Sequence, residues 1–421
     1  MRSCVLPTRK LILPGRIHRL AGLVLITLAL ALALPIGAHA TVGDGGWLPQ
    51  DSRGSVWFNA VTFTDVLRGW AVSDDGGILT TANGGTSWAA QNSGVSDDLY
   101  GVSFADAAHG WAVGDDSTIL ATTNGGTSWR RQASEEWLYF RGVSSPDALH
   151  VWVVGWGTIM ATSNGGATWR EQMSEDDDYW LSAVCFSDVT HGWAVGDAGT
   201  ILATTNGGTT WGKQSSGTIA NLRDVVFIDA RNGWAVGEAG TVVTTTDGGA
   251  RWARQESGSR EDLYGVSFPN ASHGWATGTN YTILATVDGG ATWSTQRSSD
   301  DYNFNTLTAV AFPDTTHGWV VGSGGIVLFT TTGGRPPTPA IIMLKPTAGR
   351  RGALVTIRGS GFGQARLTDS VTFGGRKCTK YVSWSLEQIK CRVPAKAKYG
   401  KVSVTVKTAG GTSNTVRFTV R

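Results

Sequence analysis

The sequence predicts an all-β protein in which a seven-bladed β-propeller is followed by a small β-sandwich. The first observation is a repeat whose central tryptophan recurs at steps of 41 residues, with one final step of 44: Trp70, Trp111, Trp152, Trp193, Trp234, Trp275 and Trp319. The second is composition, since 57 glycines and 19 tryptophans among 421 residues are typical of a turn-rich β protein. The third is a change of pattern after Gly334, where the repeats stop.

Each repeat contains four strand signals, as its fourth copy shows. Four short apolar or β-branched runs, separated by Gly, Asp, Asn or Ser, occupy residues 181–186, 193–196, 200–204 and 211–214. Between the third and fourth runs stands Asn206-Gly207-Gly208, which suits a tight hairpin with positive φ angles. Four strands within this period are typical of one propeller blade, so seven copies predict seven blades.

The hairpin between the third and fourth strands carries the pattern Thr-x-Asn/Asp-x-Gly-x-Thr/Ser-Trp in six repeats, with Arg251 at the Thr/Ser position of the fifth. The Asn or Asp of its copies is Asn83, Asn124, Asn164, Asn206, Asp247 or Asp288. The pattern resembles the Asp-box, or bacterial neuraminidase (BNR) repeat, a structural hairpin of several propeller families. The resemblance therefore implies folding chemistry at these positions and not catalysis.

The seventh repeat ends without its fourth strand, because Gly333 and Gly334 run almost directly into prolines. The other repeats end in a Trp-x-x-Gln strand, and the same signature stands near the N-terminus at Trp47-Leu48-Pro49-Gln50. We expect this segment to be the outer strand of the last blade, which would close the ring and remove an exposed edge. The propeller is then expected to span residues 41–334.

The first 40 residues have the organisation of a signal peptide. Basic residues between Arg2 and Arg19 precede an apolar run over residues 20–37, and Ala38-His39-Ala40 follows as an A-x-A cleavage signal. We expect export and a mature protein that is secreted or extracytoplasmic, at a cell surface or in a periplasm or lumen. The alternative is an uncleaved anchor, since the run approaches the ~18 to 20 residues that span a bilayer. No second apolar segment of that length follows.

The cysteine and histidine pattern predicts no metal or cofactor site. Cys378 and Cys391 lie close together in the chain, and an oxidising compartment would allow them to pair as a disulfide. Cys185 replaces a Ser, Thr, Val or Ala of other repeats, which favours a small buried thiol over a nucleophile. Histidines recur at one position before the Gly-Trp of the second strand, which indicates a turn or cap role: His109, His191, His273 and His317.

Beyond a Pro-rich linker at residues 335–340, the sequence predicts a second domain at residues 341–421. Five runs alternate as strands do: residues 341–344, 354–358, 370–373, 401–406 and 415–420. This density of short strands predicts a small immunoglobulin-like β-sandwich. A resemblance to the immunoglobulin-like IPT/TIG family rests on Pro346, Gly349, Gly352, Ile357, Gly359, Gly361, Phe362, Gly363, Val371, Phe373 and Gly374. In an exported protein, the resemblance implies a spacer or adhesion module.

Charge is divided unevenly between the two predicted domains. Residues 41–334 carry 13 basic and 31 acidic side chains, a net charge of −18, whereas residues 335–421 carry 17 basic and 2 acidic ones, a net charge of +15. Acidic groups recur between successive blades, at residues 97–98, 135–136, 175–178, 261–262 and 300–301. One face of the ring should therefore be negative, either as a solvated surface or as a docking surface. The basic domain is expected to bind an anionic surface polymer, and no nucleic acid partner is expected.

A binding site is expected where the repeats differ from one another. The residue after the first apolar residue of the first strand varies among the repeats: Asn59, Tyr100, Arg141, Ser182, Arg223, Tyr264 and Thr308. These side chains are expected to ring the mouth of the central channel on the acidic face. Trp156 is a further exception, because four other repeats have Asp or Glu at its turn position. Aromatic and arginine side chains commonly anchor interfaces, although variable surface positions also occur without any function.

The repeated patterns Leu-x-x-Val-x-Phe, His-Gly-Trp-Ala-Val-Gly and Thr-Asn-Gly-Gly-x-Thr-Trp resemble most closely the photosystem II stability/assembly factor family. The resemblance covers the propeller and not the C-terminal domain. It implies a non-enzymatic assembly factor that binds membrane-protein intermediates. We therefore expect an exported protein-binding scaffold whose partner is a protein or another envelope component.

The alternative is a carbohydrate-binding propeller or a sialidase-like glycoside hydrolase, because Asp-boxes also occur in such proteins. Catalysis would need an arginine cluster with a Tyr/Glu pair, or two facing carboxylates, in the central pocket. The Arg-Ile-Pro segment that opens sialidase domains is absent from the sequence. No catalytic residue is predicted, although the residue types for such a site are present in Arg141, Arg223, Tyr100, Tyr264 and Glu238.

Overall fold

A computed structural model of the chain describes residues 46–52, 56–132, 138–172, 180–297, 305–336, 338–363, 369–385 and 387–421. The predicted signal peptide at residues 1–40 lies outside these residues, as do the acidic segments at 135–136, 175–178 and 300–301. Within them, no helix is both long enough and apolar enough to cross a membrane.

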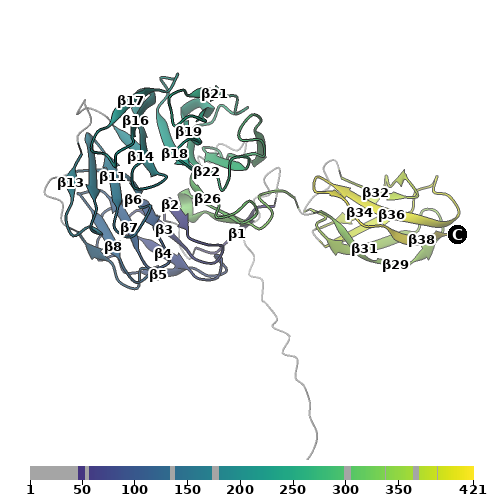
Figure 1. The fold of residues 1–421 in the computed structure, drawn as a ribbon. Coiled ribbons are helices and arrows are strands. Elements are labelled where there is room, and N and C mark those ends of the chain that lie inside the picture. The colour runs from purple at the N-terminus through teal and green to yellow at the C-terminus, as the bar shows by residue number, and fades with distance from the viewer. Residues whose placement is uncertain are drawn as a thin grey trace, which may run out of the picture. The chain divides into compact units, whose positions relative to one another are not determined.

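The repeats form seven antiparallel sheets of four strands each, which Figure 1 shows arranged as a ring. From the inside outwards, the first three blades consist of β2 (Phe58–Phe63), β3 (Gly69–Ser73), β4 (Ile78–Thr81) and β5 (Ala89–Gln91); β6 (Leu99–Phe104), β7 (Gly110–Gly114), β8 (Ile119–Thr122) and β9 (Arg130–Arg131); and β10 (Phe140–Ser144), β11 (Val151–Gly155), β12 (Thr158–Thr162) and β13 (Arg170–Glu171). The fourth and fifth blades consist of β14 (Leu181–Phe186), β15 (Gly192–Gly196), β16 (Thr200–Thr204) and β17 (Gly212–Ser215); and β18 (Leu222–Phe227), β19 (Gly233–Gly237), β20 (Thr241–Thr245) and β21 (Ala253–Gln255). The sixth and seventh blades consist of β22 (Leu263–Ser267), β23 (Gly274–Gly278), β24 (Ile283–Thr286) and β25 (Ser294–Arg297); and β26 (Leu307–Ala311), β27 (Gly318–Gly322), β28 (Val327–Thr330) and β1 (Leu48–Pro49). Each innermost strand contacts the innermost strands of both neighbouring blades, and β26 contacts β2. The predicted seven-bladed propeller is therefore confirmed.

The strands begin and end close to their predicted positions. In the fourth blade, β14 and β16 span the predicted residues, whereas β15 begins one residue earlier and β17 one residue later than predicted. Short 3-10 turns join the second and third strands of three blades: η1 (Asp197–Gly199), η2 (Glu238–Gly240) and η3 (Ser323–Gly325).

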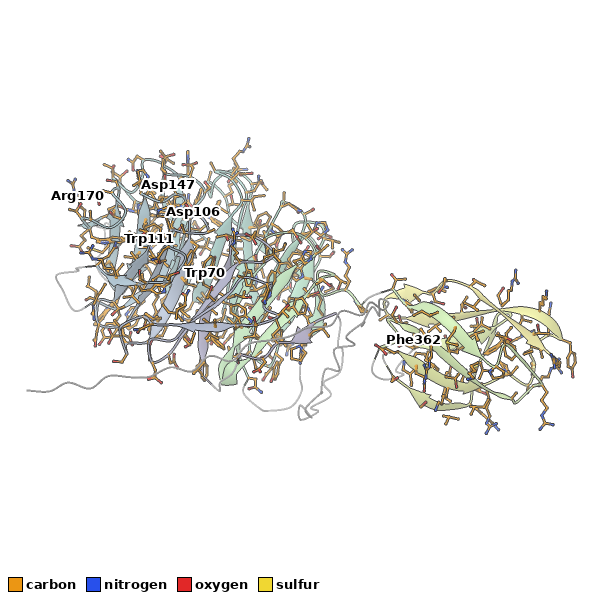
Figure 2. All side chains as sticks on the ribbon, turned by 90° about the horizontal axis from the view of Figure 1, so that it is seen from below. Trp70, Asp106, Trp111, Asp147, Arg170 and Phe362 are labelled. Carbon is orange, nitrogen blue, oxygen red and sulfur yellow. The ribbon has the colours of Figure 1, made fainter. Side chains whose placement is uncertain are left out.

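Aromatic rings join each blade to the next. Trp70 of β3 stacks on Phe104 at the end of β6, with ring centroids 3.6 Å apart, and Trp129 of the second Asp-box meets the edge of Phe104 at 5.8 Å (Figure 2 labels Trp70). The same stack recurs at five further junctions: Trp152–Phe186, Trp193–Phe227, Trp234–Phe268, Trp275–Phe312 and Trp319–Phe63. Such pairs contribute about 0.5–1.5 kcal/mol each beyond the burial of their area, so the repeated tryptophan holds adjacent blades together.

One junction departs from this arrangement, between the second and third blades. The third blade has Ser145 at the phenylalanine position, so Trp111 has no ring to stack on there, and its indole N–H is buried without a hydrogen-bond partner. Val151 stands where other blades have a glycine such as Gly110, whose added Cβ would collide with the ring of Phe104. The loss of the phenylalanine therefore makes room for the valine.

The Asp-box hairpin is held by its own side chains. In the first copy, Thr81 Oγ1 donates to Asn83 Oδ1 at 3.0 Å and accepts from the N–H of Gly85 at 2.8 Å. The indole N–H of Trp88 donates to Gln50 Oε1 of the seventh blade at 3.2 Å. These contacts confirm the structural role predicted for the hairpin.

The segment near the N-terminus closes the ring, as predicted. β1 pairs antiparallel with β28 as the outermost strand of the seventh blade. Trp47 takes the place of the missing hairpin tryptophan, because its ring meets Phe312 edge-on at 5.8 Å and its indole N–H donates to Gln296 Oε1 at 3.0 Å. Gln50 then donates to the carbonyl oxygen of Gly84 in the first blade at 3.1 Å. Both ends of the repeat region thus build one blade.

The repeated histidines lie in turns between first and second strands, as predicted. Asp314 Oδ1 accepts from the N–H groups of Thr316 and His317 at 2.6 and 2.7 Å, and Asp314 Oδ2 lies 2.8 Å from His317 Nδ1. Partial burial raises the pKa of Asp314, but these hydrogen bonds outweigh it and lower the pKa to about 2. The pairing recurs at Asp106–His109, Asp147–His150 and Asp188–His191, of which Figure 2 labels the first two aspartates.

Side chains of one blade accept hydrogen bonds from backbone N–H groups in the innermost strand of the next blade. The N–H of Phe186 donates to Ser144 Oγ of the preceding blade at 3.0 Å. Cys185 stands at the position of Ser144 in its own blade, and its sulfur accepts from the N–H of Phe227 at 3.3 Å. The predicted small thiol thus packs, partly buried, against a blade core, and its sulfur is in addition a hydrogen-bond acceptor between two blades.

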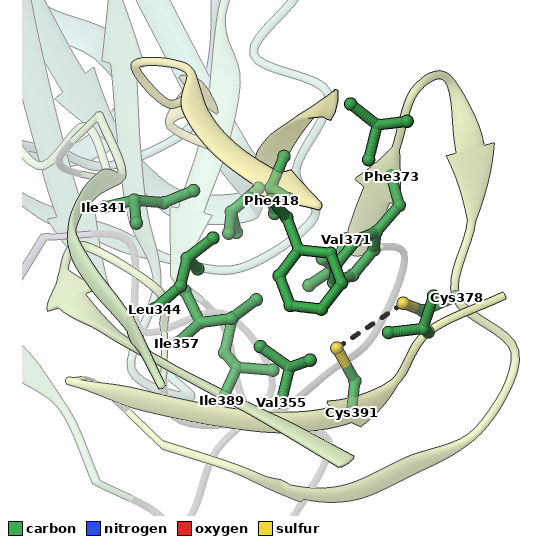
Figure 3. Packing of buried hydrophobic residues seen from close by; sticks show 14 of the residues in the cluster. Ile341, Leu344, Val355, Ile357, Val371, Phe373, Cys378, Ile389, Cys391 and Phe418 are labelled. Atoms are coloured by element: carbon green, nitrogen blue, oxygen red, sulfur yellow. Dashed lines mark hydrogen bonds between the residues drawn. The ribbon is translucent and has the colours of Figure 1, made fainter. Parts of the chain in front are cut away.

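The C-terminal domain is a sandwich of two sheets, with strand orders β29-β31-β35-β34 and β30-β38-β36-β32-β33, and β37 pairs with β36. The strands are β29 (Ala340–Lys345), β30 (Ala348–Gly349), β31 (Leu354–Ser360), β32 (Ser370–Phe373), β33 (Arg376–Lys377), β34 (Tyr381–Trp384), β35 (Gln388–Arg392), β36 (Gly400–Thr408), β37 (Gly411–Thr412) and β38 (Val416–Val420). Figure 3 shows the core between them, which includes Ile357, Phe373 and Phe418. The predicted immunoglobulin-like sandwich is confirmed, with five strands that the sequence did not predict: the two-residue strands β30, β33 and β37, and the longer β34 and β35.

Cys378 and Cys391 face each other in this core. Both are thiols, and Cys378 Sγ donates to Cys391 Sγ at 3.4 Å (Figure 3). This hydrogen bond and burial raise the pKa of the Cys391 thiol far above its usual value. The disulfide between them stays a prediction for the oxidised protein.

Replacement of the closing tryptophan, Trp47→Ala, is expected to lower the free energy of unfolding by about 3–5 kcal/mol, the usual cost of truncating a buried aromatic side chain. The thermal unfolding midpoint measures the effect. Trp57→Ala is the matched control, because Trp57 is 45% exposed and its removal should change the midpoint little. Equal midpoints for the two variants would contradict closure through Trp47.

Asp314→Ala is expected to lower the unfolding midpoint at neutral pH by about 2–4 °C, which corresponds to about 1 kcal/mol of lost hydrogen bonding. Asp314→Asn should change it much less, because Asn270 accepts the same two backbone hydrogen bonds in the sixth blade.

The same aspartate predicts a pH dependence. Folding lowers the pKa of Asp314 from 3.8 to about 2, so the ionised group stabilises the fold above the ordinary pKa, and this contribution is lost as the pH falls towards 2. The difference in midpoint between wild type and Asp314→Ala should therefore shrink below about pH 4. A constant difference from neutral pH to about pH 2 would show that the ionised carboxylate is not what stabilises the turn.

Candidate functional site

The seven variable positions predicted to ring the channel share one backbone feature. Each is the extra residue of a β-bulge in an innermost strand, at Asn59, Tyr100, Arg141, Ser182, Arg223, Tyr264 and Thr308. In the second blade, for example, Leu99 pairs with Gly114 and Gly101 with Val113, which leaves Tyr100 unpaired beside the turn that follows β7. A bulge re-aims its side chain, so these residues differ in contacts although they share a position.

Two of the ring positions form a cation–π pair. The guanidinium carbon of Arg141, an exposed residue, lies 3.8 Å from the ring centroid of Tyr100 in the neighbouring blade. The Tyr100 hydroxyl donates to Asp115 Oδ2 at 3.0 Å. Burial and then this hydrogen bond raise the pKa of Tyr100 to about 12, and burial raises that of Asp115. The face thus already holds one cation on an aromatic ring beside a carboxylate.

A second cluster forms around Arg223. Its guanidinium contacts Glu238 Oε1, and Nη1 lies 3.7 Å from Asp197 Oδ1 of the preceding blade. Burial raises the pKa of Glu238, but hydrogen bonds from Asn221 and Arg223 outweigh it and lower that pKa. Burial and the charge of Asp262 raise the pKa of Tyr264 in the next blade.

Two other ring positions serve the fold. Asn59 Nδ2 donates to Asp74 Oδ1 at 2.8 Å and to the carbonyl oxygen of Leu99 at 2.9 Å. Thr308 Oγ1 donates to the carbonyl oxygen of Phe58 at 2.7 Å. The bonds to the carbonyl oxygens of Leu99 and Phe58 join adjacent blades. Ser182 is a half-buried residue between the two arginine clusters in blade order. The seven positions are therefore not one uniform ring, and their role in binding stays a prediction.

Trp156 lies in an aromatic cluster, which we define as Tyr139, Trp156 and Trp180. The rings of Trp156 and Trp180 stack at 5.1 Å with 23° between their planes, and Tyr139 lies 6.5 Å from Trp156. A β-bridge also joins Trp156 and Trp180. The three residues are 42–51% exposed, so the cluster is a surface feature of the third and fourth blades and not part of a core.

Tyr139 and Trp180 were not predicted as site residues, although the repeat contains a signal for them. They occupy the position just before the first strand, where the seven blades have Trp57, Asp98, Tyr139, Trp180, Asn221, Asp262 and Thr306. At three of these positions, the side chain accepts a hydrogen bond from a turn N–H of the preceding blade: Asp98 from Asp75, Asn221 from Ala198 and Asp262 from Ala239, at 2.8–2.9 Å. Tyr139 and Trp180 replace such acceptors with exposed rings.

The residues named for a sialidase-like site fall into two separate contacts, one around Arg141 and one around Arg223. In the part of the chain that the structure describes, no group of three or more His, Cys, Asp or Glu side chains could hold a metal ion. The arginines named for a sialidase-like site belong to separate clusters, with Arg141 on Tyr100 and Arg223 on Glu238.

A shallow hollow of about 510 Å³ lies beside η1 of the fourth blade, where Ala198 and Gly199 line it together with β17, the residues that follow it and Arg254 of β21. Lys213, Ile219 and Arg254 are among its lining residues. Because it is shallow and contains no ring position, it is not part of the candidate site.

Comparisons with known proteins agree with the fold. The family model for the photosynthesis system II assembly factor YCF48 matches residues 47–133, 92–174, 138–217 and 258–346, and the IPT/TIG domain model matches residues 339–420. The structure titled "YCF48 bound to D1 peptide" is similar at 20% identity with a TM-score of 0.58, over 69% of this chain and 99% of that one. YCF48 from Cyanidioschyzon merolae is similar at 20% identity with a TM-score of 0.58, over 68% of this chain and 98% of that one. The WD40 β-propeller domain of Doa1 is similar at 13% identity with a TM-score of 0.55, over 69% of this chain and 97% of that one.

One curated relative matches the C-terminal domain. Cyclomaltodextrin glucanotransferase of Paenibacillus macerans is 46% identical over 83 residues, which is 19% of this chain and 11% of that enzyme. The chain thus spans about a tenth of the length of that relative. The YCF48 model, in contrast, matches more than half of this chain. The chain therefore belongs to the family of the photosynthesis system II assembly factor YCF48, and its C-terminal domain is an IPT/TIG domain.

Proposed function

We propose that the protein is a non-enzymatic scaffold that binds a polypeptide partner on the face containing the bulge residues and the aromatic cluster. The observation that carries the proposal is the row of aromatic and arginine side chains over blades two to six, exposed in the third and fourth blades and half-buried in the others, on a scaffold whose other positions repeat. Aromatic and arginine residues are enriched at the energetic centres of protein interfaces. A relative in the same family has been solved with a peptide bound, which supports the same class of ligand here.

The location and the domain arrangement belong to this proposal. Residues 1–40 direct export as a signal peptide, and the mature protein acts outside the cytoplasm. Residues 41–334 form the binding domain, a linker follows at residues 335–340, and residues 341–421 serve as a spacer or adhesion module. The separation of a propeller with net charge −18 from a domain with net charge +15 supports different partners for the two parts.

The C-terminal domain attaches to an anionic surface in this proposal. Its lysines at Lys377, Lys380, Lys396, Lys398 and Lys401 are exposed, and Lys390 is half-buried. Adsorption to a dense polyanion needs only many loose charge contacts, whereas docking of one exposed surface on another needs a fitted contact.

Photocrosslinking tests the binding face. A benzoylphenylalanine placed at Ser182 or Tyr264 in the full chain is expected to crosslink one discrete envelope protein. The same group at Leu149 or Val189 is the control, because both are exposed in turns between first and second strands, at the opposite end of the blades. Equal labelling from both pairs, or turnover of fluorogenic glycosides by the wild type, would argue against the scaffold.

A second test addresses the basic domain. The full chain is expected to bind phosphatidylglycerol vesicles and dextran sulfate at low salt and to be released by ~0.5 M salt, because exposed charges are then screened. Changing the six lysines to glutamine together should weaken both interactions by an order of magnitude or more. Binding that survives high salt and all six changes would show that charge does not hold the domain there.

A further inference from the structure

We propose that the aromatic cluster of Tyr139, Trp156 and Trp180 is the docking site for a lysine- or arginine-bearing extended segment of the partner. The inference rests on the protein-binding function proposed above and specifies the chemistry of the segment that binds. The cluster is suited to a cation because π-faces of exposed indole and phenol rings attract ammonium and guanidinium groups, Trp most strongly.

The cluster exists because three departures from the repeat meet at one point. The turn after β11 has Trp156 where other blades have Asp115, Asp197 or Glu238, and it is one residue shorter than the turn after β15. The acceptor position before the first strand is aromatic in both the third and the fourth blade, at Tyr139 and Trp180. Backbone contacts fix the rings, since the N–H of Trp156 donates to the carbonyl oxygen of Tyr139 at 3.2 Å.

Packing does not account for these rings. Trp156 is 51% and Trp180 49% exposed, whereas the tryptophans of the second strands are at most 3% exposed. Among the described residues, no cation contacts the three rings. The two arginines among the bulge residues have partners of their own, with Arg141 on Tyr100 and Arg223 on Glu238.

The negative charge around these rings favours binding of a cationic ligand over an anionic one. The propeller segment has a net charge of −18, and the sequence places acidic residues 175–178 within five positions of Trp180. Asp197 donates its N–H to the carbonyl oxygen of Trp180 at 3.0 Å, which places a further acidic residue beside the cluster. An anionic segment would be repelled here, and a cationic one is attracted before contact and then held by the rings.

A cation–π contact already exists within this face. Arg141 lies over the Tyr100 ring, and the Tyr100 hydroxyl is bonded to Asp115, so an aromatic ring with a carboxylate behind it already binds a guanidinium. A sugar platform would be served by a flat indole face with hydrogen-bonding side chains at its rim. The two indoles here instead cover part of each other's faces, with 23° between their planes.

Fluorescence anisotropy with a labelled peptide of alternating Gly and Lys tests the site in the full chain. The double variant Trp156→Ala, Trp180→Ala is expected to weaken binding of this probe about tenfold, the effect of losing a cation–π contact on each indole. Trp180→Phe should weaken it less, because a smaller ring remains. Trp57→Ala is the matched control, since Trp57 occupies the position of Trp180 in the first blade and should leave the affinity unchanged. Thermal unfolding of each variant confirms that the fold is kept.

Three outcomes would overturn the inference. The double variant could bind the lysine probe as tightly as the wild type, so that the acidic surface alone holds it. A peptide of alternating Gly and Glu could bind more tightly than the lysine probe. Maltoheptaose could bind the wild type and not the double variant, which would make the rings a sugar site.

The photocrosslink from Ser182 separates this inference from the scaffold function. If the crosslinked partner remains and the lysine peptide does not compete with it, the cationic docking site is wrong and the scaffold stands. If no partner is crosslinked, the scaffold proposal fails, and probe binding by the variants still decides whether the cluster takes cations.

Discussion

The stack of a tryptophan, a phenylalanine and a second tryptophan across a blade junction is the contact on which the propeller depends. Its three rings come from two adjacent blades, so no repeat can bury them alone. Trp70 lies flat on Phe104, and Trp129 meets the edge of the same ring. The steps of 41 residues in the sequence are the spacing of this contact along the chain. The stack also explains the ring closure, because Phe312 would lack its edge partner without Trp47.

The third blade shows what happens when the stack is absent. Ser145 replaces the phenylalanine, Val151 replaces the glycine that a ring requires, and the indole N–H of Trp111 loses its hydrogen bond. This blade also contributes Tyr139 and Trp156 to the surface cluster. The blade whose interior departs most from the repeat is therefore also the one whose surface departs most from it. Departures from a repeat pattern are expected at functional sites.

The repeat period made most of the fold predictable. The rest of the structure depends on individual side-chain contacts, which the repeat period does not specify. The closing strand could be predicted because Trp47 and Gln50 repeat a signature that the seventh repeat lacks. β35 was missed although Ile389 and Cys391 alternate with polar residues, as a strand requires, and both are fully buried. The ring positions could be identified from the sequence, but not their pairing, because a bulge lets each side chain turn to a different neighbour. Trp180 was missed because four of its six equivalents in other blades are polar, which is typical of a loop position.

Charge alone does not identify the binding surface on this face. Asp98 and Asp262 belong to the recurrent acidic segments, yet each accepts a hydrogen bond from a turn of the preceding blade, a role that Asn221 fills without charge. Part of the acidity is therefore folding chemistry, and it would be present whether or not the face binds anything. The rings of Tyr139 and Trp180 stand at the same position, and they neither cap that turn nor enter a core. What distinguishes Tyr139 and Trp180 from the single exposed Trp57 at the same position is that they form one contiguous aromatic patch with Trp156.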